Sequence, residues 1–130
     1  MSYEFNTTLQ AGFDAALDTV RGVLMEEHLG VVSEVNVQAI FKTKMDRTIP
    51  PYRIFGACNP KLAKRILDVE PNAGTLLPCN FIMYENADGT TTVSFMDPVT
   101  VLGLAKSEEA HAVGAEAKEK LMRVMEKLSA

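Results

Sequence analysis

Both cysteines of the chain lie in one segment, residues 52–85, and each is followed by an asparagine. They form two pairs, Cys58-Asn59 and Cys79-Asn80. An apolar run at residues 52–57 leads into the first pair, and a second apolar run at residues 81–84 follows the other. Short apolar runs of this kind, bounded by turn residues, are typical of β-strands. The segment therefore predicts two strands whose ends carry the two Cys-Asn pairs.

A helix is expected between these two strands. Asn59-Pro60 predicts its start, because asparagine caps a helix well and proline is favoured at the first helical position. A buried stripe at helical spacing follows: Leu62, Ala63, Ile66 and Leu67. Glu70-Pro71 is expected to end the helix, and residues 72–78 are expected to form a loop.

The N-terminal third predicts two further strands and two helices. Residues 2–7 alternate as a half-buried strand does. Thr7 or Thr8 is expected to cap a helix that ends at Gly30 and carries apolar residues at helical spacing: Leu9, Phe13, Leu17, Val20, Leu24 and Leu29. A strand at residues 31–35 follows, and Asn36 is expected to cap a short helix with one apolar face: Val37, Ile40, Phe41 and Met45.

The C-terminal part predicts a hairpin and two helices. The strands at residues 81–84 and 91–95 flank Asp88-Gly89, a common hairpin turn. Asp97-Pro98 predicts a short helix through Leu104, and Ser107 is expected to cap the last helix. One domain over residues 1–130 is expected. Its fold class is α+β, a two-layer α/β sandwich in which helices cover a mixed or mainly antiparallel sheet of about five strands.

Composition narrows the class of function. The net charge of -4 argues against nucleic-acid binding, which needs basic residues to neutralise phosphates. No apolar stretch is long enough for a transmembrane helix, and the first residues lack the pattern of a signal peptide. We therefore expect a cytoplasmic protein with reduced thiols and no membrane partner.

Several motifs together resemble a known family. They are YRIFGACNP, LLPCN, GTTTVSFMDP and the run Val35-Asn36-Val37-Gln38 after the turn at Gly30. In this order and spacing, the motifs resemble those of a DUF302 (TT1751-like) domain, which belongs to a family of small proteins of uncharacterised function. The resemblance covers nearly the whole chain. The resemblance implies a compact two-layer α/β fold and a homodimer. It supplies no reaction and no cofactor.

The two thiols allow two interpretations. A thiol next to a helix N-terminus can be activated as a thiolate, and a second thiol can resolve it. Free cysteine is also among the most buried residue types and often only fills space. The choice depends on geometry, because antiparallel strands would bring Cys58 and Cys79 together, whereas a parallel crossover would place them at opposite ends of the sheet.

The other candidates have local structural roles as well. Asn59 and Asp97 are expected to cap helices. Asn80 has no such evident task, and at a strand start its amide can either satisfy a turn or point into a cleft. Asp97 could also present a carboxylate beside the cysteines. His28 and His111 are not accompanied by a third ligand, so no metal site is expected.

We therefore expect a homodimer that binds a small ligand or a protein partner in a cleft near the two Cys-Asn turns. The expected ligand-binding residues are Cys58, Asn59, Cys79, Asn80 and Asp97. The alternative is a thiol-dependent redox or sulfur-handling enzyme, with Cys58 as nucleophile, Cys79 as resolving thiol and Asp97 as proton acceptor. A third possibility is an assembly domain that dimerises through an apolar sheet face.

Overall fold

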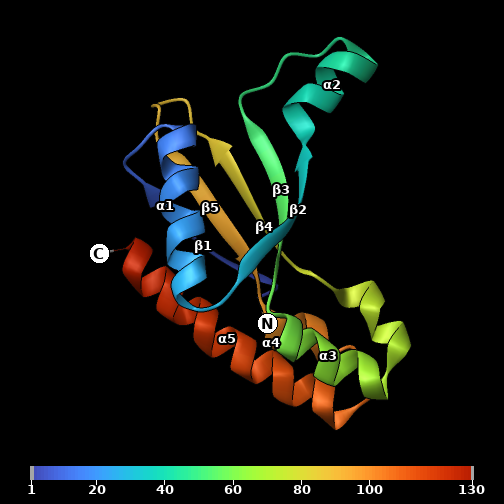
Figure 1. The fold of residues 1–130 in the computed structure, drawn as a ribbon. Helices are drawn as coiled ribbons and strands as arrows, with labels where there is room; N and C mark the ends of the chain where they lie inside the picture. The colour runs from blue at the N-terminus through green and yellow to red at the C-terminus, as the bar shows by residue number, and fades with distance from the viewer. Residues whose placement is uncertain (1, 130) are drawn as a thin grey trace.

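A computed structural model gives the fold of the chain and describes residues 2–129. It contains one antiparallel sheet with strand order β1-β5-β4-β3-β2. The strands are β1 (Glu4–Leu9), β2 (Gly30–Asn36), β3 (Tyr52–Cys58), β4 (Cys79–Glu85) and β5 (Thr91–Met96). The helices are α1 (Phe13–Glu26), α2 (Val37–Met45), α3 (Pro60–Val69), the 3-10 helix η1 (Pro71–Leu76), α4 (Pro98–Leu102) and α5 (Glu108–Leu128). The predicted α+β class is confirmed, and all strand pairs are antiparallel (Figure 1).

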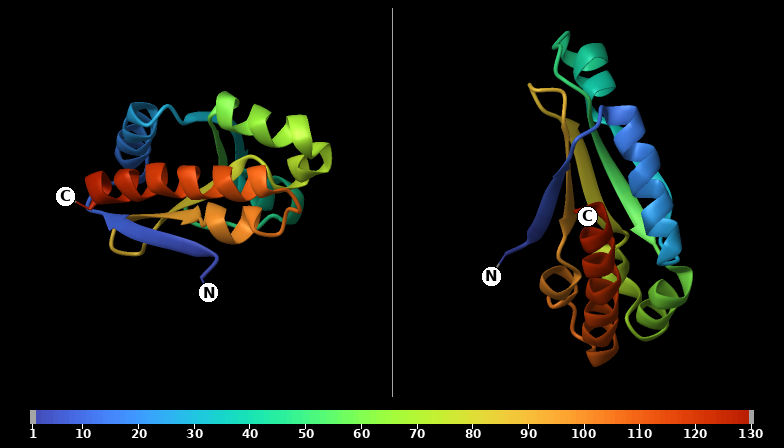
Figure 2. Two further views of the ribbon diagram at one scale, coloured as in Figure 1. Left: turned by 90° about the horizontal axis from the view of Figure 1, so that it is seen from below. Right: turned by 90° about the vertical axis from the view of Figure 1, so that its left-hand side faces the viewer.

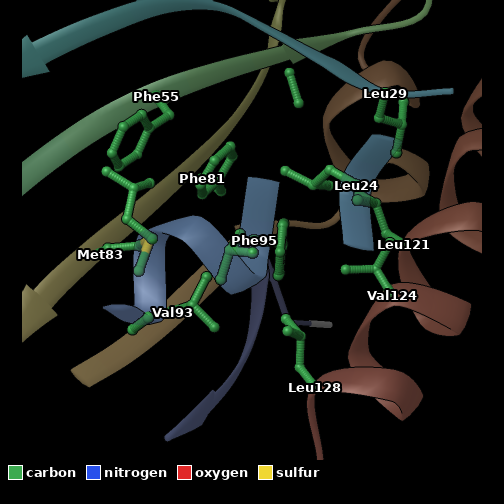
Figure 3. Close-up of a cluster of buried hydrophobic side chains, with 14 of the residues drawn as sticks. Leu24, Leu29, Phe55, Phe81, Met83, Val93, Phe95, Leu121, Val124 and Leu128 are labelled. Atoms are coloured by element: carbon green, nitrogen blue, oxygen red, sulfur yellow. The ribbon is translucent and has the colours of Figure 1, made fainter. Parts of the chain in front are cut away.

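One face of the sheet and the helices α1 and α5 enclose the main hydrophobic core. Alternate residues of a strand point to opposite faces, so each strand contributes every second residue to this core. Figure 3 shows the buried side chains of the sheet packed against those of the two helices: Phe55, Phe81, Met83, Val93 and Phe95 against Leu24, Leu121, Val124 and Leu128. The alternation predicted for these strands thus determines which face the helices cover.

The remaining helices extend the molecule at both ends of the sheet. α3, η1 and α4 lie with the start of α5 at one end and form a second buried cluster: Ile66, Ala73, Leu102, Ala105, Ala110 and Val113. α2 projects beyond the opposite end and has no buried residue (Figures 1 and 2). The predicted apolar face of α2 is therefore largely exposed.

The second face of the sheet carries no hydrophobic core among residues 2–129. Its side chains come from the alternate positions of the same strands, and rows of them follow the register. One row is Val35, Ile54, Ile82, Ser94 and Asn6. These residues are half-buried or exposed. This uncovered side is called the open face below.

The predicted boundaries of the first helix are wrong at both ends. The strand β1 continues through Leu9, which pairs with Thr91 of β5, and α1 begins only at Phe13 after Gly12. The helix ends before Gly30, because His28 takes the left-handed conformation with φ of 59° and Leu29 donates to the carbonyl of Leu24. Pairing with a distant strand thus overrides the local helical spacing of Leu9.

The loop predicted at residues 72–78 is also partly wrong. Residues 71–76 form the 3-10 helix η1, in which Ala73 is buried in the second cluster. Leu76 and Leu77 pack against that cluster. Short 3-10 turns commonly continue from the end of an α-helix, and here η1 follows α3 directly.

The predicted helix caps are confirmed except at the first helix, where Thr7 and Thr8 lie in β1 and Gly12 precedes α1 without a side-chain cap. Asn36 accepts a hydrogen bond from the amide of Ala39, and Ser107 accepts one from the amide of Ala110. The caps at Asn59 and Asp97 are described with the site below. A side-chain acceptor at this position satisfies a backbone donor that the helix leaves free.

Two acidic residues at the C-terminal end of α1, Glu26 and the capping residue Glu27, tie this helix to α5. Glu26 pairs with Lys127 at 2.8 Å, and Glu27 pairs with Arg123 at 2.8 Å. The hydrogen bond from Arg123 is the main reason that the pKa of Glu27 is lowered. These contacts offset the unfavourable position of two carboxylates at a helix C-terminus.

We expect Gly56→Ala to destabilise the fold by about 1–3 kcal/mol, the usual cost of overpacking. A methyl group at Gly56 would lie 2.3 Å from Cγ of Pro78 and 2.4 Å from Oγ of Ser33. Gly22→Ala is the matched control, because a methyl group there meets nothing within 4 Å and the residue lies in α1. The free energy of unfolding of this control should increase by about 0.5–1 kcal/mol, because alanine has a higher helix propensity than glycine. Urea unfolding measures both variants, and equal stability of the two would contradict the expectation.

Candidate functional site

The two cysteines meet at one corner of the sheet. β3 and β4 are antiparallel, and Cys79 lies opposite Ala57, the residue before Cys58. Both cysteines are free and, with Asn59, line a cavity of about 30 Å³ between the sheet end and α3. The rest of the wall is mostly apolar and includes Leu62 and Ile66. We call this region the cysteine corner; its cavity holds little more than a single water molecule.

Burial keeps both thiols of the cysteine corner protonated. It raises the pKa of Cys58 above the ordinary thiol value. Burial and the neighbouring Cys58 together raise the pKa of Cys79 to about 11. A helix N-terminus such as the start of α3 favours the thiolate form of a nearby thiol, but the loss of solvation in the apolar surroundings has the larger effect on the pKa of Cys58. Such surroundings disfavour the thiolate that a thiol-dependent reaction uses.

Asn59 uses its side chain to fix the start of α3. The amide oxygen accepts hydrogen bonds from the backbone N–H groups of Lys61 and Leu62, at 3.0 and 3.2 Å. The amide nitrogen donates to the carbonyl oxygen of His28 at 3.3 Å. Both ends of the amide are occupied, so Asn59 joins α3 to the turn between α1 and β2.

Asp97 likewise has a structural role. Its carboxylate accepts from the amide of Val99 at 2.9 Å and forms an ion pair with Lys118 of α5 at 2.8 Å. Burial, the largest single influence, raises the pKa of Asp97, but the hydrogen bonds from Lys118 and the amides of α4 together outweigh it and lower the pKa. Asp97 is thus an ionised helix cap that holds α4 against α5.

Asn80 is separated from the other four predicted residues. It lies opposite Gly56 on β3, and strand alternation places it on the open face, away from the side chain of Cys79. The structure thus brings Cys58, Asn59 and Cys79 together, places Asp97 at the start of α4, and directs Asn80 to the opposite side of the sheet.

The open face contains a groove of about 330 Å³. The strands β1, β5 and β4 and the residue before β1 line it, with Tyr3, Glu4, Asn6, Asn80, Ile82, Tyr84, Ser94 and Met96. We call it the open-face groove. Its volume reaches the lower end of the range found for small-molecule sites.

Glu4 is the charged group of the open-face groove. Ser94 donates to its carboxylate at 2.5 Å, and the amide of Asn6 donates to it at 2.9 Å. The hydrogen bond from Asn6, followed by that from Ser94, lowers the pKa of Glu4. The carboxylate is therefore ionised at neutral pH and held by neutral donors from two adjacent strands.

Aromatic and apolar side chains line the rest of the groove. The ring of Tyr84 stacks on that of Tyr52, with centroids 5.7 Å apart and planes 8° from parallel. Ile82 and Met96 lie between this ring pair and Glu4 in the register of the sheet. The groove therefore combines one carboxylate, several neutral polar groups and an apolar floor.

Sequence reasoning missed Glu4, Asn6, Ser94 and Tyr84. The alternation of polar and apolar residues in the strands was visible, but it does not show which strands are neighbours. The pairing of β1 with β5 brings Glu4 to Ser94 across about 90 residues of sequence. No local motif indicates that contact.

A metal site requires a cluster of ligating side chains, and a membrane span requires a long apolar helix. Between residues 2 and 129, no group of three or more His, Cys, Asp or Glu side chains is placed to hold a metal ion. His28 lies in the turn after α1, and His111 contacts the carbonyl of Ala105 at 2.8 Å. None of the helices in that range is long and apolar enough to cross a membrane.

The fold and the groove define a small α+β domain with helices on one face of an antiparallel sheet and a groove on the other. The chain belongs to the family described as domain of unknown function DUF302, which it matches over residues 5–128. A solved structure of an uncharacterised conserved DUF302 protein from Bacillus stearothermophilus has the same fold, with a TM-score of 0.87. It is 21% identical and the match covers 98% of this chain and 99% of that one. No curated protein matches the chain.

Both thiols should react slowly with alkylating reagents in the folded protein. With a pKa of about 11, Cys79 should be alkylated by iodoacetamide at pH 8 more than about a hundredfold slower than an unperturbed thiol, because so little thiolate is present. Cys58→Ala and Cys79→Ala variants report each thiol separately, and urea-unfolded protein gives the reference rate. Fast alkylation of either thiol in the native state would contradict this picture.

Proposed function

We propose that the protein is a homodimeric, non-catalytic module that binds a small ligand in the open-face groove. The observation that carries the proposal is the groove itself, where an oriented carboxylate, free polar groups and an apolar floor converge in about 330 Å³. Ligand sites commonly have this composition, mostly apolar walls with a few placed polar groups. Of the five residues expected at the site, Asn80 lines this groove.

The cysteine corner is a poorer candidate. Its cavity of about 30 Å³ is too small for an organic ligand, and Asn59 already uses both ends of its amide. The raised pKa values of Cys58 and Cys79 also oppose the thiol-dependent enzyme, which needs a thiolate. The proposal therefore treats both cysteines as packing residues of a protein in the reducing cytoplasm.

The homodimer is proposed to form through α2 and β2. Exposed large apolar side chains concentrate there, with Val32, Val35, Ile40, Phe41 and Met45 each at least 36% exposed. α2 has no buried residue of its own, so packing against a second copy would give its apolar face a partner. A two-fold arrangement would place the same helix on both sides of the contact, as isologous dimers require. The groove on β1, β5 and β4 stays outside this contact.

Asn80→Ala should weaken ligand binding without loss of stability. The side chain is exposed and makes no hydrogen bond within residues 2–129, so the free energy of unfolding should change by less than about 0.5 kcal/mol. A fragment collection containing cationic, neutral and anionic compounds, screened against 15N-labelled protein, should perturb the amides around the groove. Hits should bind the variant at least about fivefold more weakly, as for the loss of one hydrogen bond. Asn72→Ala, an exposed asparagine in η1, is the matched control. A screen that leaves the groove amides unperturbed would refute the ligand site.

Phe41→Glu should dissociate the dimer. The chain should sediment at twice its 14.2 kDa mass, and the variant should sediment at 14.2 kDa, because a buried charge at the contact lacks a partner. Met122→Glu is the control, since Met122 is a 47% exposed apolar residue on α5, outside α2 and β2. Sedimentation of the wild type as a monomer, or of the Phe41 variant as a dimer, would rule out this interface.

A further inference from the structure

The charge and shape of the open-face groove restrict the chemistry of its ligand. We propose that the groove takes a compact organic cation, a primary amine on an apolar or aromatic body, with Glu4 as its counter-ion. This inference rests on the proposed function and names the ligand class of that same groove.

Glu4 differs from most other partly buried carboxylates of the molecule in having no cationic partner. Asp97 is paired with Lys118, and Glu27 is paired with Arg123. Within residues 2–129, no Lys, Arg or His nitrogen lies within 4 Å of the Glu4 carboxylate. The groove therefore contains an ionised group whose charge the surrounding side chains leave uncompensated.

The carboxylate is also held in place with room for another donor. Oε2 accepts the hydrogen bond from Ser94 at 2.5 Å and the shorter of two contacts from Asn6, at 2.9 Å. Oε1 accepts only the longer contact from Asn6, at 3.3 Å. Because a carboxylate has about four acceptor positions, Oε1 can still accept from an ammonium group in the groove.

The remaining walls suit the body of such a ligand. The Tyr84 ring is held against Tyr52, which gives the groove a fixed aromatic surface for the body of the ligand, away from Glu4. Ile82 and Met96 supply apolar contact. The amide of Asn80 can hydrogen-bond a hydroxyl or carbonyl on the far end of the ligand.

The same lining disfavours anions. No lysine, arginine or histidine lines the groove, so a carboxylate or phosphate would meet Glu4 without a compensating charge. A neutral ligand could use the apolar floor, but it would leave the Glu4 charge uncompensated. The groove should therefore rank ligands of equal shape in the order cation, neutral, anion.

A series of matched probes tests this order. Tyramine, 2-(4-hydroxyphenyl)ethanol and 4-hydroxyphenylacetate share one aromatic body and differ in the charge of the terminal group. Each probe is titrated into 15N-labelled protein at pH 7. Tyramine should bind roughly tenfold more tightly than the alcohol, because it gains one charge-assisted hydrogen bond to Glu4. The acid should bind most weakly. Added salt should weaken tyramine binding and leave alcohol binding unchanged.

Glu4→Gln tests the role of the carboxylate. Glutamine keeps an acceptor for Ser94 but removes the charge, so tyramine and the alcohol should bind this variant equally. Glu26→Gln is the control, because Glu26 is an exposed carboxylate on α1, away from the groove lining, and it should keep the wild-type preference. Thermal unfolding of each variant verifies that it is folded, and the salt dependence of the wild type tests the proposal without any substitution.

The outcomes separate the ligand class from the proposed function. If the alcohol or the acid binds the wild type as tightly as tyramine, or if Glu4→Gln keeps the preference, the ligand is not a cation, while the groove remains a binding site. If neutral or anionic fragments perturb the amide signals of the groove, while neither tyramine nor the cationic fragments do, a cationic ligand is likewise excluded. If neither the series nor the fragment collection perturbs the groove, the proposed function fails, and this inference fails with it.

Discussion

A row of phenylalanine rings across the sheet is the contact on which the rest of the structure depends. The ring centroids of Phe55 and Phe81 are 4.8 Å apart, those of Phe81 and Phe95 are 5.3 Å apart, and those of Phe95 and Phe5 are 6.0 Å apart. The four rings come from β3, β4, β5 and β1, and all contribute to the same core. Because they require a cover against water, α1 and α5 pack on this face, and the alternate residues are left on the open face.

Sequence reasoning succeeded where a signal is local. The caps at Asn59 and Asp97 depend on a side chain and on amides two or three residues away, so their structural roles could be predicted from the residue and its neighbours. The α+β class followed from the change between strand and helix spacing. The end of the first strand was predicted wrongly because Leu9 fits helical spacing, whereas its pairing with Thr91 depends on a strand far along the chain.

The candidate site could be predicted only in part for the same reason. Cys79 and Asn80 are neighbours in sequence, and placing the strand start at residue 81 hid the fact that they point to opposite faces. The contact between Glu4 and Ser94 depends on strand order, which short-range patterns do not encode. Cys58 and Cys79 did meet at the antiparallel end of two strands, but only the packing around them shows that burial suppresses their ionisation.

Because β1 lies at the edge of the sheet, the open-face groove forms only at a late stage of folding. β1 is made before the other four strands, yet within residues 2–129 it pairs with β5 alone, about 90 residues later. Closing so long a loop is entropically costly, and such non-local pairing belongs to the slow part of folding. Until most of the chain has left the ribosome, Glu4 and Ser94 cannot face each other. The groove is therefore assembled by the pairing of strands that lie far apart in the sequence, and a ligand held there would bind only a chain in which β1 and β5 have paired.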